Sequence, residues 1–101
     1  MTELQLTARI MKAIRTRYPS VYVQRVSERF LSGIPDIRII LDGLSGDIEV
    51  KLPGKKTTGI QDKVLEWIAC AGGACVVVTS VDEALDFIRE LQITALQRRM
   101  Q

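Results

Sequence analysis

The segment from Gly33 to Lys51 constrains the fold most strongly, because apolar residues alternate with charged ones in two runs around a glycine-containing turn. Side chains two residues apart lie on the same face of a β-strand. The apolar positions are Ile37, Ile39 and Leu41 in the first run, and Ile48 and Val50 in the second. A turn over residues 43–46 that pairs residue 42 with residue 47 brings these positions together. The sequence therefore predicts a β-hairpin with one buried face, and burial of that face fixes its register.

The other face of this predicted hairpin carries charged side chains. In the same register Glu49 lies opposite Ile40. Lys51 lies opposite Arg38, with Asp36 one step beyond Lys51. Two carboxylates held close together need a proton or a cation between them, and Mg2+ and Mn2+ prefer such oxygen ligands. A bound ion can activate a water molecule, which Lys51 can help to position. Alternatively, these residues form weak ion pairs on a solvated strand face.

The rest of the chain predicts an α/β fold. Apolar residues at helical spacing indicate helices, and β-branched or aromatic runs indicate strands. Besides the hairpin, the predicted elements are a helix over 2–18 capped by Thr2, a strand over 21–26, a polar connector over 27–32, a helix over 60–71, a strand over 74–79 and a helix from 81 into the nineties. The continuously apolar strand over 74–79 is expected to be covered on both faces. With 101 residues, the chain predicts one domain over 1–101, a mixed four-stranded sheet flanked by helices.

Composition excludes several kinds of chemistry. The chain has no histidine, which excludes Ser-His-Asp or Cys-His catalysis and histidine-containing zinc sites. Cys70 and Cys75 flank a short apolar segment, and we expect buried, reduced thiols. Neither a signal peptide nor a membrane-spanning run is recognisable, so we expect a cytoplasmic protein with no membrane partner. Eleven of the 14 basic residues precede Val64, which favours a DNA-facing surface in that part of the chain.

Several of these residues together resemble the VRR-NUC (virus-type replication-repair nuclease) domain of the PD-(D/E)XK nuclease superfamily. The resemblance covers nearly the whole chain, which has the size of the stand-alone phage and prophage members. It is carried by Gly33-Ile34-Pro35-Asp36, Glu49-Val50-Lys51, Gly54, Gln61 and Ala71-Gly72-Gly73. The resemblance implies a restriction-endonuclease-like core and metal-dependent hydrolysis of DNA phosphodiester bonds. It also implies a homodimer that acts on branched DNA such as four-way (Holliday) junctions.

The resemblance also implies roles for individual residues. Asp36, Glu49, the carbonyl of Val50 and Glu3 would bind Mg2+ or Mn2+. Asp36, Glu49, Lys51 and Gln61 would be the catalytic residues.

Two of these assignments have alternatives in the sequence itself. Glu3 shares a helix face with Leu6 and Ile10, so it could reach a metal site or merely favour the helix dipole. Gln61 also points inward, from the first turn of its predicted helix. It could hold a water molecule or a phosphate oxygen, or satisfy a backbone carbonyl.

Four basic residues are candidate DNA contacts. Lys55 and Lys56 follow Lys51 in a predicted loop and suit a phosphate backbone, although an ordinary exposed loop would also carry lysines. Arg38 lies on the charged face of the hairpin, and Lys12 lies on the basic outer face of the first helix. The leading hypothesis is a metal-dependent endonuclease. The alternatives are a DNA-binding module that has lost cleavage and an α/β interaction domain that binds no nucleic acid.

Overall fold

Helices and strands follow one another in the predicted order in the computed structural model, which describes residues 1–27 and 32–101. The elements are α1 (Glu3–Arg17), β1 (Tyr22–Arg25), β2 (Ile37–Leu41), β3 (Leu44–Val50), α2 (Gly59–Cys70), β4 (Ala74–Val78) and α3 (Val81–Arg99). The sheet has the order β1-β2-β3-β4, in which β4 is parallel to β3 and the other pairs are antiparallel. The predicted α/β class and mixed four-stranded sheet are confirmed. The connector predicted over 27–32 lies largely outside the described residues.

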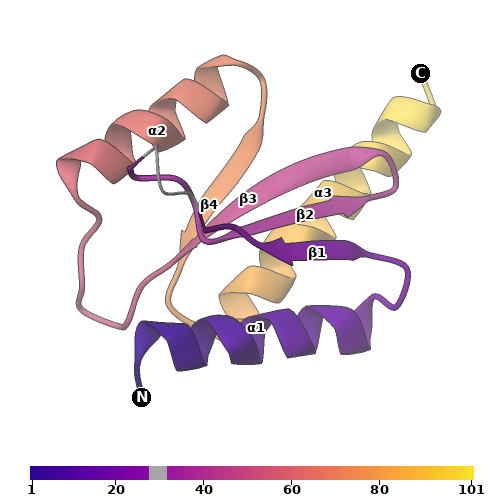
Figure 1. Ribbon diagram of the computed structural model, residues 1–101. Coiled ribbons are helices and arrows are strands. Elements are labelled where there is room, and N and C mark those ends of the chain that lie inside the picture. Colours follow the sequence, from indigo (N-terminus) through magenta and orange to yellow (C-terminus); the bar gives the residue numbers. More distant parts are fainter. Residues whose placement is uncertain (28–31) are drawn as a thin grey trace.

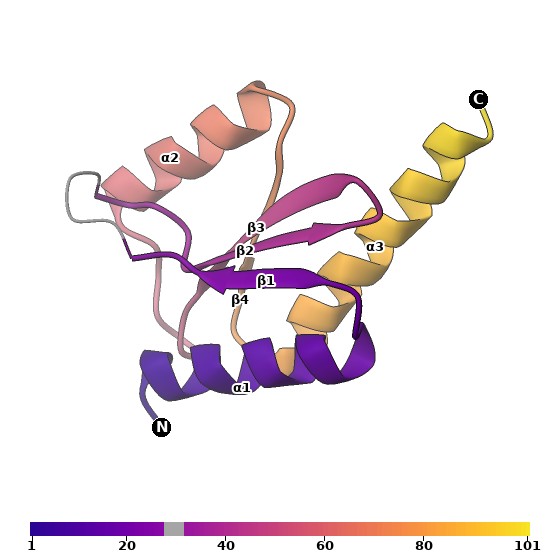
Figure 2. The same cartoon turned by 45° about the vertical axis from the view of Figure 1, so that its right-hand side comes forward.

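The helices divide between the two faces of the sheet (Figure 1). α1 and α3 pack on each other and against one face, whereas α2 packs over β4 on the opposite side (Figure 2). The core lies between the sheet and the α1–α3 pair. Its fully buried side chains include Ile10, Ile14, Ile37, Ile39, Ile48, Val50, Val78 and Ile88. These positions follow the period of two on the strands and the helical period on α1 and α3.

The turn between β2 and β3 differs from the prediction. Asp42 and Gly43 both have positive φ, at 52° and 81°, which is the conformation of a two-residue type I′ hairpin turn. Leu41 consequently pairs with Leu44. The predicted turn over residues 43–46 is therefore wrong, and β3 begins earlier than expected.

The corrected register changes the partners on the charged face. The shift involves an even number of positions, so each face keeps its residues. Arg38 lies opposite Asp47, and not opposite Lys51 as predicted. Continuing the same register places Asp36 opposite Glu49, whereas the prediction placed Asp36 beyond Lys51. The hairpin thus brings the two acids closer together than the sequence indicated.

Gly46 lies inside β3 because α3 leaves no room for a side chain there. A Cβ atom on Gly46 would lie 2.8 Å from the ring of Phe87 and 2.8 Å from Cδ1 of Leu91. We expect Gly46→Val to lower the free energy of unfolding by about 1–3 kcal/mol, because these side chains must leave their packed positions. Urea denaturation measures the change. Ser45→Val, at the exposed neighbouring position, is the control, and equal midpoints for the two variants would contradict this account.

α2 contacts β4 on one face and α3 contacts it on the other, so the prediction that this strand is covered on both faces is confirmed. Because β4 is an edge strand, Val78 is its single fully buried residue. The predicted burial of the two cysteines is wrong. Cys70 is an exposed free thiol and Cys75 is only partly buried. Cys70 follows Gln61 by nine residues, or two and a half helical turns, which turns its side chain away from the sheet. Within residues 1–27 and 32–101, no helix is both long and apolar enough to cross a membrane.

Candidate active site

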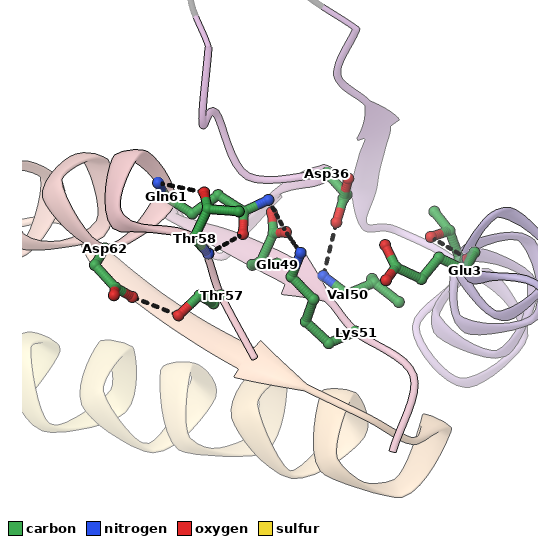
Figure 3. A network of polar contacts seen from close by, with 10 residues as sticks. Glu3, Asp36, Glu49, Val50, Lys51, Thr57, Thr58, Gln61 and Asp62 are labelled. Atoms are coloured by element: carbon green, nitrogen blue, oxygen red, sulfur yellow. Dashed lines mark hydrogen bonds and ion pairs between the residues drawn. The ribbon is translucent and has the colours of Figure 1, made fainter. Parts of the chain in front are cut away.

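The predicted site residues meet at the carboxyl end of β3 (Figure 3). Asp36 immediately precedes β2, Glu49 and Val50 end β3, and Lys51 follows it. Gln61 approaches from the first turn of α2. All four predicted catalytic residues therefore lie in one place, because the hairpin supplies three of them and the start of α2 supplies the fourth.

Asp36 is held in position by the backbone of β3. Its Oδ2 accepts a hydrogen bond from the backbone N–H of Val50 over 2.7 Å. One carboxylate oxygen is thereby fixed, and the other can bind a ligand. Val50 orients Asp36 through its N–H, while its carbonyl is the backbone ligand that the resemblance implies.

Glu49 is the most buried carboxylate of the described residues, with 2% of its surface exposed. Its Oε2 accepts a hydrogen bond from Nε2 of Gln61 over 3.0 Å and lies 3.7 Å from Nζ of Lys51. Burial raises the pKa of Glu49 to about 7, the charges of Asp36 and Glu3 act in the same direction, and Lys51 opposes them. Because the acids outweigh the single lysine, a bound cation would stabilise the ionised site.

Gln61 is oriented by the cap of α2. Thr58 Oγ1 accepts a hydrogen bond from the Gln61 backbone N–H over 3.2 Å, and Gln61 Oε1 accepts one from the Thr58 backbone N–H over 2.9 Å. This reciprocal pair is a capping box. Because the cap holds the amide oxygen, the amide nitrogen faces Glu49. This double role of Gln61 was not predicted, although the spacing Thr58-x-x-Gln61 is the signature of a capping box.

The available donors suit a hard divalent cation. Asp36, Glu49 and the carbonyl of Val50 would supply oxygen atoms, which Mg2+ and Mn2+ prefer. Within the described ranges, no three His, Cys, Asp or Glu side chains form a group that could hold a metal. A two-carboxylate site still fits Mg2+, which commonly keeps several waters and binds substrate phosphate. Figure 3 shows the Glu3 side chain directed from α1 toward these residues, where it could contact such a water.

The predicted DNA contacts do not all lie on the same side of the molecule. Lys55 and Lys56 are exposed in the segment that connects Lys51 to α2. Arg38 is exposed on the sheet face that also carries the site. Lys12 follows Glu3 by nine residues on α1, so it projects from the opposite side of that helix. Contact of all four residues with DNA remains a prediction. Lys12 could bind only DNA that passes along the side of α1 opposite the candidate active site.

Comparisons with known proteins bear on the fold. No family model matches the sequence, and no curated protein is significantly similar to it. A solved structure described as a VRR_NUC domain matches this chain with a TM-score of 0.68 and 27% sequence identity. The match covers 81% of this chain and 92% of that one. The resemblance stated from the sequence is confirmed by this likeness.

Proposed function

This chain has the architecture of a VRR_NUC domain, and from that premise we propose that it is a metal-dependent endonuclease that hydrolyses DNA phosphodiester bonds. The main support is the position of Glu49, which is buried between Asp36 and Lys51 with its pKa raised to about 7. Such a site favours a divalent cation at neutral pH. The complete set of two acids, a lysine and a glutamine argues against the alternative of a DNA-binding module that has lost cleavage.

Each side chain has a distinct part in this proposal. Asp36, Glu49 and the Val50 carbonyl would hold the ion, and Glu3 would assist directly or through water. A bound Mg2+ or Mn2+ supplies charge neutralisation and a water molecule of lowered pKa. Lys51 orients the attacking water or stabilises the negative charge that develops on the phosphate. Gln61 keeps the Glu49 carboxylate in place through its amide nitrogen.

A cleavage assay on two substrates tests this function. We expect cleavage of a four-way junction, and more slowly of a linear duplex, with Mn2+ or Mg2+ and none with EDTA. Lys51→Ala should lose cleavage, and Lys63→Ala, at an exposed position on α2, should keep it. Circular dichroism establishes that both variants fold. DNA binding without cleavage would support the inactive module instead, and no binding at low salt would support an interaction domain.

We also propose a homodimer, for which α2 offers a surface. No residue of α2 is fully buried. Ile60 and Trp67 expose 56% and 73% of their surface. Ile60, Val64, Trp67 and Ala71 recur at the spacing of a helix–helix seam. A large exposed tryptophan beside other apolar side chains suits an interface. Two sites related by a two-fold axis would suit paired cuts in branched DNA.

Trp67→Glu is expected to convert the dimer to a monomer, because a buried unpaired carboxylate opposes association. Size-exclusion chromatography with light scattering measures the mass. Leu96→Glu, at a position on α3 that is 56% exposed, is the control and should leave the mass unchanged. A wild-type protein that is monomeric at every concentration would contradict the dimer.

A further inference from the structure

Within residues 1–27 and 32–101, no helix covers the half of one sheet face that β1 and β2 form beside the candidate active site. α1 and α3 cover the opposite face, and α2 packs over β4 rather than over β1 and β2. Tyr22 and Ile40 pair across β1 and β2 and are 52% and 43% exposed. Gln24 and Arg38 form the next pair on the same face. We call these four residues the open sheet face.

The open sheet face continues directly into the site. Asp36, Arg38 and Ile40 occupy alternate positions along the β2 strand direction, so their side chains share one face. At the rise of a β-strand, Arg38 lies about 7 Å and Ile40 about 13 Å along the strand from Asp36. A DNA strand with a phosphodiester at Asp36 would therefore bring its neighbouring nucleotides over Arg38 and Ile40.

Arg38 is held in an orientation that suits a phosphate. Its Nε donates a hydrogen bond to Oδ1 of Asp47 over 3.0 Å. The Asp47 side chain is largely buried, whereas that of Arg38 is 53% exposed. This contact uses Nε and not the terminal guanidinium nitrogens, which carry the donors for an oxyanion. Asp47 lowers the net charge of the pair. Because Asp47 already orders the Arg38 side chain, less entropy is lost when Arg38 binds a phosphate.

Tyr22 supplies an aromatic surface on the same rigid strands. Its hydroxyl donates a hydrogen bond to Oε1 of Gln24 over 3.1 Å, which restrains the ring beside Ile40. An exposed ring on a sheet is a stacking platform for a nucleobase. A base inside a duplex is covered on both sides by its neighbours, so only an unpaired base could stack there.

We propose that the open sheet face binds an unpaired segment of the DNA strand next to the bond that is cleaved, with a base stacked on Tyr22 and a phosphate bound by Arg38. This inference rests on the proposed nuclease function. It predicts that, among DNA substrates, those with unpaired nucleotides beside the cleavage point are preferred.

Fluorescence anisotropy in EDTA tests the surface without cleavage. The probes are a labelled oligothymidine strand and a labelled blunt duplex of the same length. We expect Tyr22→Ala to weaken binding of the single strand by at least about fivefold, the lower end of the contribution of one stacked base. Tyr22→Phe should bind like the wild type because it keeps the ring. Arg38→Gln should weaken binding and reduce its salt dependence, whereas Arg89→Gln, at an exposed position on α3, should do neither.

Three results would overturn the inference. One is single-strand binding that Tyr22→Ala leaves unchanged. Another is an equal loss of single-strand and duplex binding in that variant. The third is a change of molecular mass in Tyr22→Ala with unchanged DNA binding, which would assign the face to a second copy of the chain. Tyr22-dependent binding by a wild-type protein that cleaves no DNA with Mn2+ would support the surface and contradict only the nuclease activity.

Discussion

Glu49→Gln is expected to reduce metal-dependent DNA cleavage by at least about a hundredfold. The same variant is expected to unfold at a higher temperature than the wild type at about pH 8 without metal. Glutamine has nearly the same size, and its amide oxygen can still accept the hydrogen bond from Gln61. It carries no charge with which to hold a cation. Burial raises the pKa of Glu49 to about 7, so the ionised carboxylate destabilises the metal-free protein, and the variant removes that cost.

Two measurements on one sample test the pair of effects. Thermal unfolding in EDTA at about pH 8 reports stability, and the initial cleavage rate with Mn2+ reports activity. Glu66→Gln removes an exposed carboxylate from α2 and should change neither quantity. A Glu49→Gln variant that cleaves normally would show that this carboxylate is not the metal-binding acid described above. One that melts at a lower temperature than the wild type would contradict the raised pKa of Glu49.

Mn2+ is expected to stabilise the protein strongly at about pH 8 and weakly at about pH 5.5. The pKa of Glu49 rises from 4.5 to about 7 on folding, so the folded protein keeps this proton at pH values where the unfolded chain has lost it. Metal-free stability therefore falls as the pH rises through this window, by up to about 3 kcal/mol. A cation needs the ionised carboxylate and competes with the proton, so its effect grows as the pH rises through the same window.

Melting temperatures with and without Mn2+ at the two pH values measure this competition. Asp36→Asn should abolish the Mn2+ effect at both values, and Asp86→Asn, at an exposed position on α3, should preserve it. A shift that is equal at the two pH values would contradict the linkage to Glu49. A calorimetric titration in which Mn2+ gives no heat beyond dilution would contradict a metal site altogether.

Local patterns in the sequence were sufficient to predict which side chains share a face, but not which residues pair. Alternation assigns Ile37 and Ile48 to the core even though the turn was misplaced, because a shift of the register by an even number of positions preserves both faces. The turn itself was misplaced because Gly46 was taken as a turn residue. Its real constraint is contact with Phe87, which lies about forty residues later in the sequence. A contact that depends on α3 leaves no signal in the neighbourhood of Gly46.

The candidate site was predicted as a set of residues and not as a set of contacts. Helical and strand periods direct Glu49, Lys51 and Gln61 inward, and the structure brings them together. The bond from Val50 to Asp36 depends on the true register. The bond from Arg38 to Asp47 depends on it as well. Neither bond follows from a hairpin whose turn lies over residues 43–46.

The capping box at the start of α2 determines where an inserted residue would disturb the candidate active site. Gln61 closes the first helical turn with Thr58 and contacts Glu49 with the same amide group. Extra residues within 52–56 would enlarge a surface loop and leave that geometry alone. A single residue inserted between Thr58 and Gln61 would rotate the amide by about 100° around the helix axis, and the same change would unwind the helix start and release the buried acid.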